Sequence, residues 1–172
     1  VRMRSLADVV LVGAETVRRE RYGSVNATGA SRNGAVGLPP PIAIVTRSID
    51  LDWSLPLFRT ESDDGRDAVR PIIITCESAP SDRLAQAYEH ATVVVAGRRA
   101  VELGAALAAL STLGYDVVLC EGGPRLLGEL VGDGLLDELC LTVAPLMGGD
   151  PLPVAVMPTG AAPLDFELKH VT

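Results

Sequence analysis

The stretch that decides the fold is VVLCEGGPRLLGELVGDGLLDEL, residues 117–139. Four apolar residues run directly into Glu121, a pair of glycines and Pro124. The apolar run predicts a buried strand, and the aliphatic residues of 126–131 recur at helical spacing. Proline suits the first turn of a helix, where its missing N–H costs nothing, and the later glycines predict the end of that helix. We therefore expect a strand joined to a helix by a glycine-rich turn.

Similar apolar runs, rich in β-branched residues, recur along the chain. Most are continuous rather than alternating, which is typical of parallel strands that are buried on both faces. Helical patterns over residues 81–91, 100–114 and 124–134 separate several of them. Strands that alternate with helices favour a layered α/β fold with a mainly parallel sheet. The expected strands are 9–13, 42–46, 72–75, 92–97, 116–123 and 139–145.

The remaining segments complete this expected layout. Residues 1–8 predict the last turns of a helix that leads into the first strand, and residues 168–171 predict the start of another strand. Residues 23–41 and 52–70 are rich in small or polar residues and are expected to be long loops, a kind of segment that is usually functional or mobile. Without an internal repeat or a linker, residues 1–172 predict a single domain, truncated at both ends.

The composition limits the class of protein. The formal net charge of −7 argues against nonspecific binding to nucleic acid or to a membrane surface, which needs a basic face. Cys76, Cys120 and Cys140 lie in or beside apolar runs and are expected to be reduced thiols of a cytoplasmic protein. His90 and His170 have no partner at ligand spacing, so no metal site is expected. No apolar run approaches the length of a membrane span.

The turn between the strand and the helix of the opening stretch carries the strongest functional signal. Ligands of parallel sheets bind beyond the carboxyl ends of the strands. Gly122 and Gly123 would leave backbone N–H groups exposed at the start of a helix, and the helix dipole adds to their attraction for an anion such as a diphosphate. A plain strand-to-helix turn is the alternative. Glu121 has little structural purpose at the end of a buried strand, so we interpret it as functional.

Two other strand ends carry polar residues. The sequence GAET, residues 13–16, repeats the pattern of strand, glycine and helix start; its threonine could cap the helix or donate to a phosphate. The sequence TRS, residues 46–48, places a guanidinium between two hydroxyls, which suits a phosphate monoester, although a surface arginine is the alternative. The chain contains none of the G-x-G-x-x-G, G-x-x-x-x-G-K-[ST] or G-x-S-x-G motifs, which disfavours a standard Rossmann site, a P-loop and a hydrolase elbow.

Together these stretches resemble one family. LADVVLVGAETVRRERYG (6–23), IAIVTRS (42–48) and VVLCEGGPRLLGELVGDGLLDELCLTVAPLMGG (117–149) are similar to the pyrimidine reductases of riboflavin biosynthesis, which include the C-terminal reductase domain of the bifunctional deaminase–reductase. The similarity covers nearly the whole chain. It implies a dihydrofolate-reductase-like three-layer αβα fold with a mainly parallel mixed sheet, lacking its first and last strands in this chain. The implied reaction is the NADPH-dependent reduction of 5-amino-6-(5-phosphoribosylamino)uracil to its ribityl form.

The resemblance also implies roles for individual residues. Glu121 would lie near the nicotinamide and the substrate, as the candidate catalytic residue. The glycine pair would lie under the cofactor diphosphate, and residues 46–48 would hold the adenosine side with its 2′-phosphate. The candidate cofactor-binding residues are Gly13, Ala14, Thr16, Thr46, Arg47, Ser48, Thr75, Gly122, Gly123, Pro124, Arg125, Leu126 and Leu127. The expected partners are a phosphorylated pyrimidine and a second copy of the chain in a homodimer, with neither nucleic acid nor a membrane.

Two alternatives stay open at this level. A reductase of the same fold could act on a pterin of the dihydrofolate type instead of a pyrimidine. A nucleotide-binding module without catalysis would carry the same glycine turn and the same phosphate-binding residues. Assays with both classes of substrate distinguish these possibilities.

Overall fold

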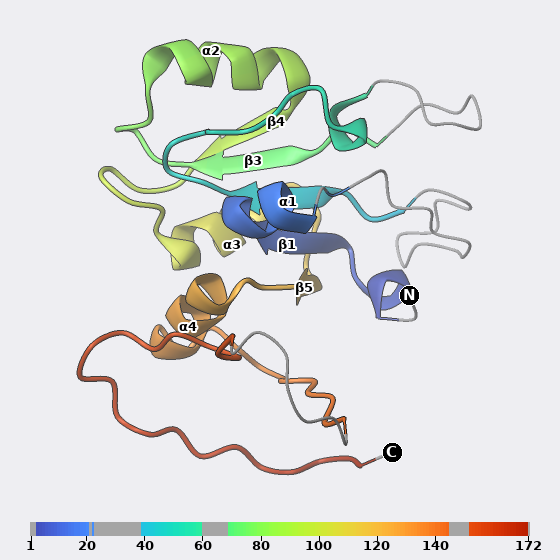
Figure 1. The fold of residues 1–172 in the computed structure, drawn as a ribbon, viewed down its shortest axis with the longest axis vertical. Coiled ribbons are helices and arrows are strands. Elements are labelled where there is room, and N and C mark those ends of the chain that lie inside the picture. The colour runs from blue at the N-terminus through green and yellow to red at the C-terminus, as the bar shows by residue number, and fades with distance from the viewer. Residues whose placement is uncertain (1–2, 21, 23–38, 60–68, 145–151, 172) are drawn as a thin grey trace.

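The structure is a computed structural model, and it describes residues 3–20, 22, 39–59, 69–144 and 152–171. Its centre is a sheet of five parallel strands in the order β4-β3-β2-β1-β5 (Figure 1). The strands are β1 (Val9–Gly13), β2 (Ile42–Val45), β3 (Ile72–Thr75), β4 (Thr92–Val95) and β5 (Val118–Cys120). The α-helices are α1 (Ala14–Glu20), α2 (Ser81–His90), α3 (Leu103–Thr112) and α4 (Pro124–Gly132), and the short 3-10 helices are η1 (Arg4–Leu6) and η2 (Pro56–Phe58).

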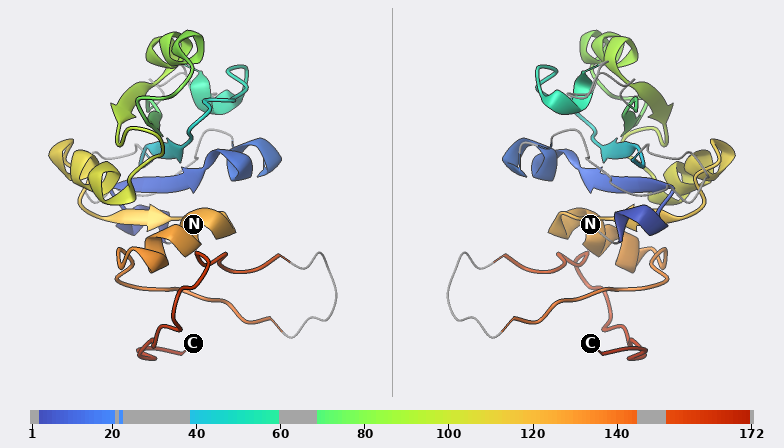
Figure 2. Two further views of the ribbon diagram at one scale, coloured as in Figure 1. Left: turned by 90° about the vertical axis from the view of Figure 1, so that its left-hand side faces the viewer. Right: turned by 90° about the vertical axis from the view of Figure 1, so that its right-hand side faces the viewer.

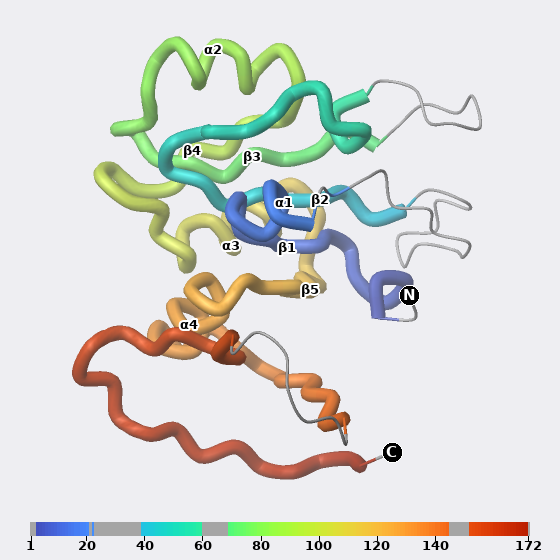
Figure 3. The backbone as a smooth tube through the Cα atoms, in the orientation of Figure 1, coloured from blue at the N-terminus to red at the C-terminus, as the bar shows by residue number. Residues whose placement is uncertain are grey.

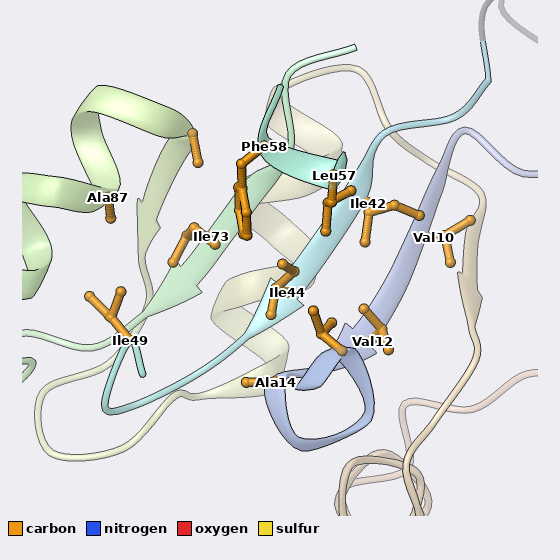
Figure 4. Packing of buried hydrophobic residues seen from close by; sticks show 12 residues of the cluster. Val10, Val12, Ala14, Ile42, Ile44, Ile49, Leu57, Phe58, Ile73 and Ala87 are labelled. Atoms are coloured by element: carbon orange, nitrogen blue, oxygen red, sulfur yellow. The ribbon is translucent and has the colours of Figure 1, made fainter. Parts of the chain in front are cut away.

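The sheet is covered on both faces, which confirms the three-layer α/β arrangement. Side chains alternate along a strand, so Val10 and Val12 of β1 face α1, whereas Val9 and Leu11 face α3 and α4. Helices α1 and α3 lie on opposite sides of the sheet in Figure 2, and Figure 4 shows the packing on the α1 side. Burial on both faces explains why the strands read as continuous apolar runs.

The register of β1 places the end of this strand beside the glycine pair that follows β5. Leu11 of β1 is level with Ala43 of β2 and with Cys120 of β5. Because the strands are parallel, their carboxyl ends meet at one edge of the sheet. At that edge the N–H of Gly13 donates to the carbonyl of Gly122 at 2.8 Å, which joins the two predicted glycine turns directly.

Two predicted strands are shorter than expected by two residues or more. The strand predicted over 92–97 is Thr92–Val95, and the one predicted over 116–123 is Val118–Cys120. Gly97 and Gly122 have φ values of 99° and 90°, a conformation that turns the chain away from the sheet and that glycine adopts readily. The loop expected over 23–41 falls mostly on residues outside the described ranges. Of the one expected over 52–70, the structure describes 52–59 and 69–70, which include the short helix η2.

Two further predicted strands are wrong. Within residues 139–144 and 168–171, the structure has no strand, and these residues are exposed. They belong to an extended C-terminal segment, drawn orange to red, that runs away from the sheet in Figure 3. An extended segment becomes a strand only when its N–H and C=O groups pair with a neighbour, and these segments pair with none of the described strands. The predicted helix over residues 1–8 is also reduced, to the single 3-10 turn η1.

Other structural findings concern the part of the chain that is described. None of its helices combines the length and the apolar character needed to cross a membrane. Its His, Cys, Asp and Glu side chains form no cluster of three or more that could hold a metal ion. All three cysteines are free thiols.

Asp8 ties the start of β1 to the start of β5. Its side chain is almost completely buried, and Oδ2 accepts hydrogen bonds from the N–H groups of Asp116 at 3.1 Å and Val117 at 2.8 Å. We expect Asp8→Ala to lower the free energy of unfolding by about 3 kcal/mol, because two N–H groups lose a charged acceptor. The melting temperature should fall by roughly 6–12 °C in a chain of this length.

Asp8→Asn is the matched control, measured by the same thermal and chemical denaturation. Its side-chain carbonyl can still accept both hydrogen bonds, so we expect less than half of the loss caused by alanine. Equal losses for the two variants would show that the hydrogen bonds of Asp8 do not carry the effect.

Candidate functional site

The turn after β5 has a backbone that requires glycine. Gly122 has a φ of 90°, which side-chain-bearing residues rarely adopt, and the Gly122–Gly123 peptide bond is cis. A Cβ atom on Gly123 would lie 2.9 Å from Oγ1 of Thr16, closer than ordinary contact allows. A Cβ atom on Gly13 would lie 3.6 Å from the backbone nitrogen of Gly123. The predicted glycines and Thr16 are therefore packed against one another.

This packing brings the starts of two helices together. Helix α1 begins at Ala14, directly after β1, and α4 begins at Pro124, directly after the glycine pair. The first N–H groups of a helix have no partner within the helix, and the helix dipole gives that end a partial positive charge. The shared edge of α1 and α4 thus offers backbone donors to an anion from two directions.

A cavity of about 310 Å³ opens at this shared edge. Its lining contains two carboxylates, Glu15 and Glu20, and two guanidinium groups, Arg19 and Arg125, so their formal charges balance. The volume is at the lower end of the range for ligand pockets. The lining residues are Glu15, Thr16, Arg19, Glu20, Gly123, Pro124, Arg125, Leu126, Leu152, Pro153 and Val156.

The C-terminal segment forms one wall of this cavity, which the sequence analysis did not foresee. The N–H of Val156 donates to the carbonyl of Pro124 at 2.8 Å. A Cβ atom on Gly128 would lie 1.9 Å from the Val156 carbonyl oxygen, and one on Gly132 would lie 2.9 Å from Cγ of Pro158. The segment can approach α4 only because both helix positions lack a side chain. Two glycines four residues apart within a predicted helix were the available signal.

Glu121 is held by two residues that the sequence analysis also missed. Its Oε1 accepts a hydrogen bond from Nε of Arg4 at 2.5 Å, and its Oε2 accepts one from Nη2 of Arg4 at 2.5 Å. The hydroxyl of Tyr22 donates to the same Oε2 at 2.6 Å. The Arg4 and Glu121 side chains are 28% and 22% exposed. No local motif marks Arg4 or Tyr22, because each is about a hundred positions from Glu121 in the sequence.

These contacts change the ionisation of the groups involved. Burial alone would raise the pKa of Glu121, but the hydrogen bonds from Arg4 and Tyr22 outweigh burial and lower that pKa below its usual value. Burial, and then the hydrogen bond to Glu121, raise the pKa of Tyr22. Burial likewise raises the pKa of the neighbouring Cys120 thiol. Glu121 is therefore an anion, and Tyr22 keeps its proton.

The TRS turn lies at the end of β2, outside the cavity. Thr46 is buried, and its Oγ1 accepts a hydrogen bond from the N–H of Ile49 at 3.0 Å. Ile49 has a φ of 49°, which is rare for a β-branched residue and marks a strained turn. Arg47 and Ser48 are exposed at the tip, and the Ser48 carbonyl accepts a hydrogen bond from Arg83 at 3.0 Å. The side chain of Thr46 thus holds the turn that presents Arg47 to solvent.

The predicted cofactor-binding residues fall into two groups along one edge of the sheet. The first surrounds the glycine turn and consists of Gly13, Thr16, Gly122, Gly123, Pro124, Arg125 and Leu126. The second consists of Thr46, Arg47 and Ser48. Ala14 is buried beneath the first group, Leu127 does not line the cavity, and the Thr75 side chain is completely buried at the end of β3.

Solved structures share this fold. A pyrimidine reductase-like protein from Corynebacterium diphtheriae superposes with a TM-score of 0.66 at 27% identity, covering 78% of this chain and 57% of that chain. Acinetobacter baumannii RibD superposes with a TM-score of 0.64 at 18% identity, covering 97% of this chain and 41% of that chain, which shows similarity of fold alone.

Two curated proteins have similar sequences, and each bears the name 2,5-diamino-6-ribosylamino-4(3H)-pyrimidinone 5′-phosphate reductase. The one from Methanothermobacter thermautotrophicus is 32% identical over 148 residues, covering 86% of this chain and 63% of that protein. The one from Archaeoglobus fulgidus is 28% identical over 151 residues, covering 86% and 66% respectively. The chain thus spans about two thirds of the length of these relatives. Because the model of the RibD C-terminal domain matches residues 1–172, the chain belongs to the RibD C-terminal domain family.

Proposed function

We propose that the chain is the NADPH-binding reductase part of an enzyme of riboflavin biosynthesis. Its substrate is a ribosylamino-pyrimidine 5′-phosphate, whose ribosyl group is reduced to ribityl. The similar curated proteins are named for the 2,5-diamino-pyrimidinone form of such a substrate. The family resemblance of the sequence implied the 5-amino-uracil form, which belongs to the same chemical class. Membership of the RibD C-terminal domain family supports this class.

The observation that carries the proposal is the meeting of two helix starts at a glycine pair. A diphosphate fits this place chemically, because backbone donors of α1 and α4 face one edge and a Cβ atom on Gly122 would meet nothing within 4 Å. Thr16 would add a hydroxyl donor, and Arg125 a guanidinium.

When bound, NADPH supplies the hydride for the reduction. The residues of the chain bind and orient the reactants and keep water out of the site. Glu121 directly precedes the glycine pair, where its negative charge opposes a bound diphosphate. We therefore assign it to the substrate, as an acceptor for donor groups beside the nicotinamide.

We expect the wild-type protein to bind NADPH about tenfold more tightly than NADH. Arg47 is exposed at the tip of the TRS turn, with no ion pair among the described residues, and a charge-assisted contact with the 2′-phosphate is worth roughly this much at an exposed site. Fluorescence titration of both cofactors against the wild type and Arg47→Ala measures the preference.

NADH provides the matched control, since it lacks the 2′-phosphate. Arg47→Ala should weaken NADPH to the level of NADH and leave NADH unchanged. Equal affinity of the wild type for both cofactors would reject NADPH specificity.

Turnover assays on the complete gene product test the reaction itself. NADPH oxidation is followed with the 5-amino-uracil substrate, the 2,5-diamino-pyrimidinone substrate and dihydrofolate. Oxidation with either pyrimidine supports the proposal, and oxidation with dihydrofolate alone rejects it. A cytoplasmic setting fits the free thiols, and the homodimer expected from the family is tested by analytical ultracentrifugation.

A further inference from the structure

The carboxylate of Glu121 has nearly all of its hydrogen-bonding capacity in use. An ionised carboxylate offers about four acceptor sites, two on each oxygen. Arg4 occupies one site on Oε1 and one on Oε2 as a two-pronged fork, and the Tyr22 hydroxyl occupies the second site on Oε2. No other donor among the described residues bonds to this carboxylate, so with respect to them one acceptor site, on Oε1, is left for a ligand.

The donors around Glu121 also decide what it can do. Arginine is not deprotonated in proteins, so Arg4 stays a donor at every working pH. The Tyr22 hydroxyl points its proton at Oε2, and the guanidinium of Arg4 lies 5.6 Å from the centre of the Tyr22 ring, which holds the three side chains as one cluster. A carboxylate surrounded in this way has no proton to give to a substrate.

We infer that Arg4 and Tyr22 are positioning residues that fix Glu121 as an anion with a single open acceptor site. The ligand for that site is a neutral or cationic N–H or O–H group of the bound substrate. The inference rests on the proposed function for the identity of the substrate, but not for the state of Glu121. The charged or titratable groups that act on Glu121 among the described residues are Arg4, Tyr22 and the Cys120 thiol.

A kinetic cycle tests whether Arg4 and Tyr22 act through Glu121. Arg4→Met and Tyr22→Phe are made singly and in combination with Glu121→Gln in the complete gene product. We expect kcat/KM for the pyrimidine phosphate to fall about tenfold in Arg4→Met and about threefold in Tyr22→Phe, with no further loss when either is added to Glu121→Gln. Losses that multiply in the double variants would overturn the inference.

Arg70→Met is the matched control for lost stability. Nη2 of Arg70 donates to the carbonyls of Tyr88, Glu89 and Ala91 around the end of α2, away from Glu121. This variant should lower the melting temperature and leave kcat/KM unchanged. A comparable loss of kcat/KM in Arg70→Met would show that the effect of Arg4→Met is only structural.

A titration that does not need turnover separates this inference from the proposed function. In the ¹³C-labelled wild type, the side-chain carboxyl signal of Glu121 should titrate below the usual pH range of a glutamate, and Tyr22→Phe should move its titration to higher pH, because the hydrogen bond from the Tyr22 hydroxyl is lost. A wild type that reduces no pyrimidine would reject the proposed function, and the titration would still decide the state of Glu121. Titration of Glu121 within or above the usual range of a glutamate would overturn the inference.

Discussion

Gly123→Val is expected to weaken NADPH binding by about a hundredfold or more and to leave most of the fold intact. A Cβ atom at this position already lies 2.9 Å from Oγ1 of Thr16, and the two methyl groups of valine would occupy the space in front of the helix starts. A bound diphosphate would lose about 3 kcal/mol of contacts with charge-assisted donors. The change leaves the buried core of the sheet untouched.

Circular dichroism and NADPH titration of the same sample measure both parts of this expectation. Gly123→Ala, which adds the Cβ alone, should give an intermediate loss. Gly104→Val is the matched control, because a side chain at Gly104 in α3 would meet nothing within 4 Å. If Gly123→Val retains tight binding, the glycine pair is only a strand-to-helix turn.

Glu121→Gln is expected to lower kcat/KM for the pyrimidine substrate by about 10²-fold, in the range of a group that positions the substrate. Glutamine keeps the shape of the side chain and removes its charge. NADPH affinity should stay unchanged or become slightly tighter, because the variant removes a negative charge next to the glycine pair, where we propose that the diphosphate binds. Steady-state kinetics and cofactor titration on this variant measure the two quantities.

The ion pair with Arg4 adds a stability cost to the same variant. The Arg4 guanidinium would face an amide in place of a carboxylate, so the melting temperature should also fall. Arg70→Met again shows how much turnover changes when stability alone is lost. Near-wild-type kcat/KM in Glu121→Gln would end the functional interpretation of Glu121 and leave it as an anchor for Arg4.

The sequence by itself determined the elements that depend on local patterns. Continuous apolar runs identified β1, β2 and β3, because strands buried on both faces cannot alternate polar and apolar residues. The helix after the glycine pair was predicted to begin at Pro124, as it does, since proline and glycine act through the backbone of their own position. The parallel sheet predicted that the polar strand ends would lie along one edge, whereas the contact between the two glycine turns depends on the pairing of β5 with β1, which the sequence did not predict.

Only the tertiary structure decided the contacts between distant segments. Glu121 is 117 positions from Arg4 and 99 from Tyr22, and no local pattern records which side chains will surround a carboxylate. The expected strand over residues 139–145 was wrong for the same reason: an apolar, β-branched segment has the propensity for a strand, but the backbone becomes one only when another strand pairs with it. The reason for glycine at position 128 is likewise visible only in the tertiary structure, where the backbone of Val156 leaves no room for a side chain on Gly128. Propensity acts within a few residues, whereas pairing, burial and charge neutralisation depend on what the rest of the chain brings alongside.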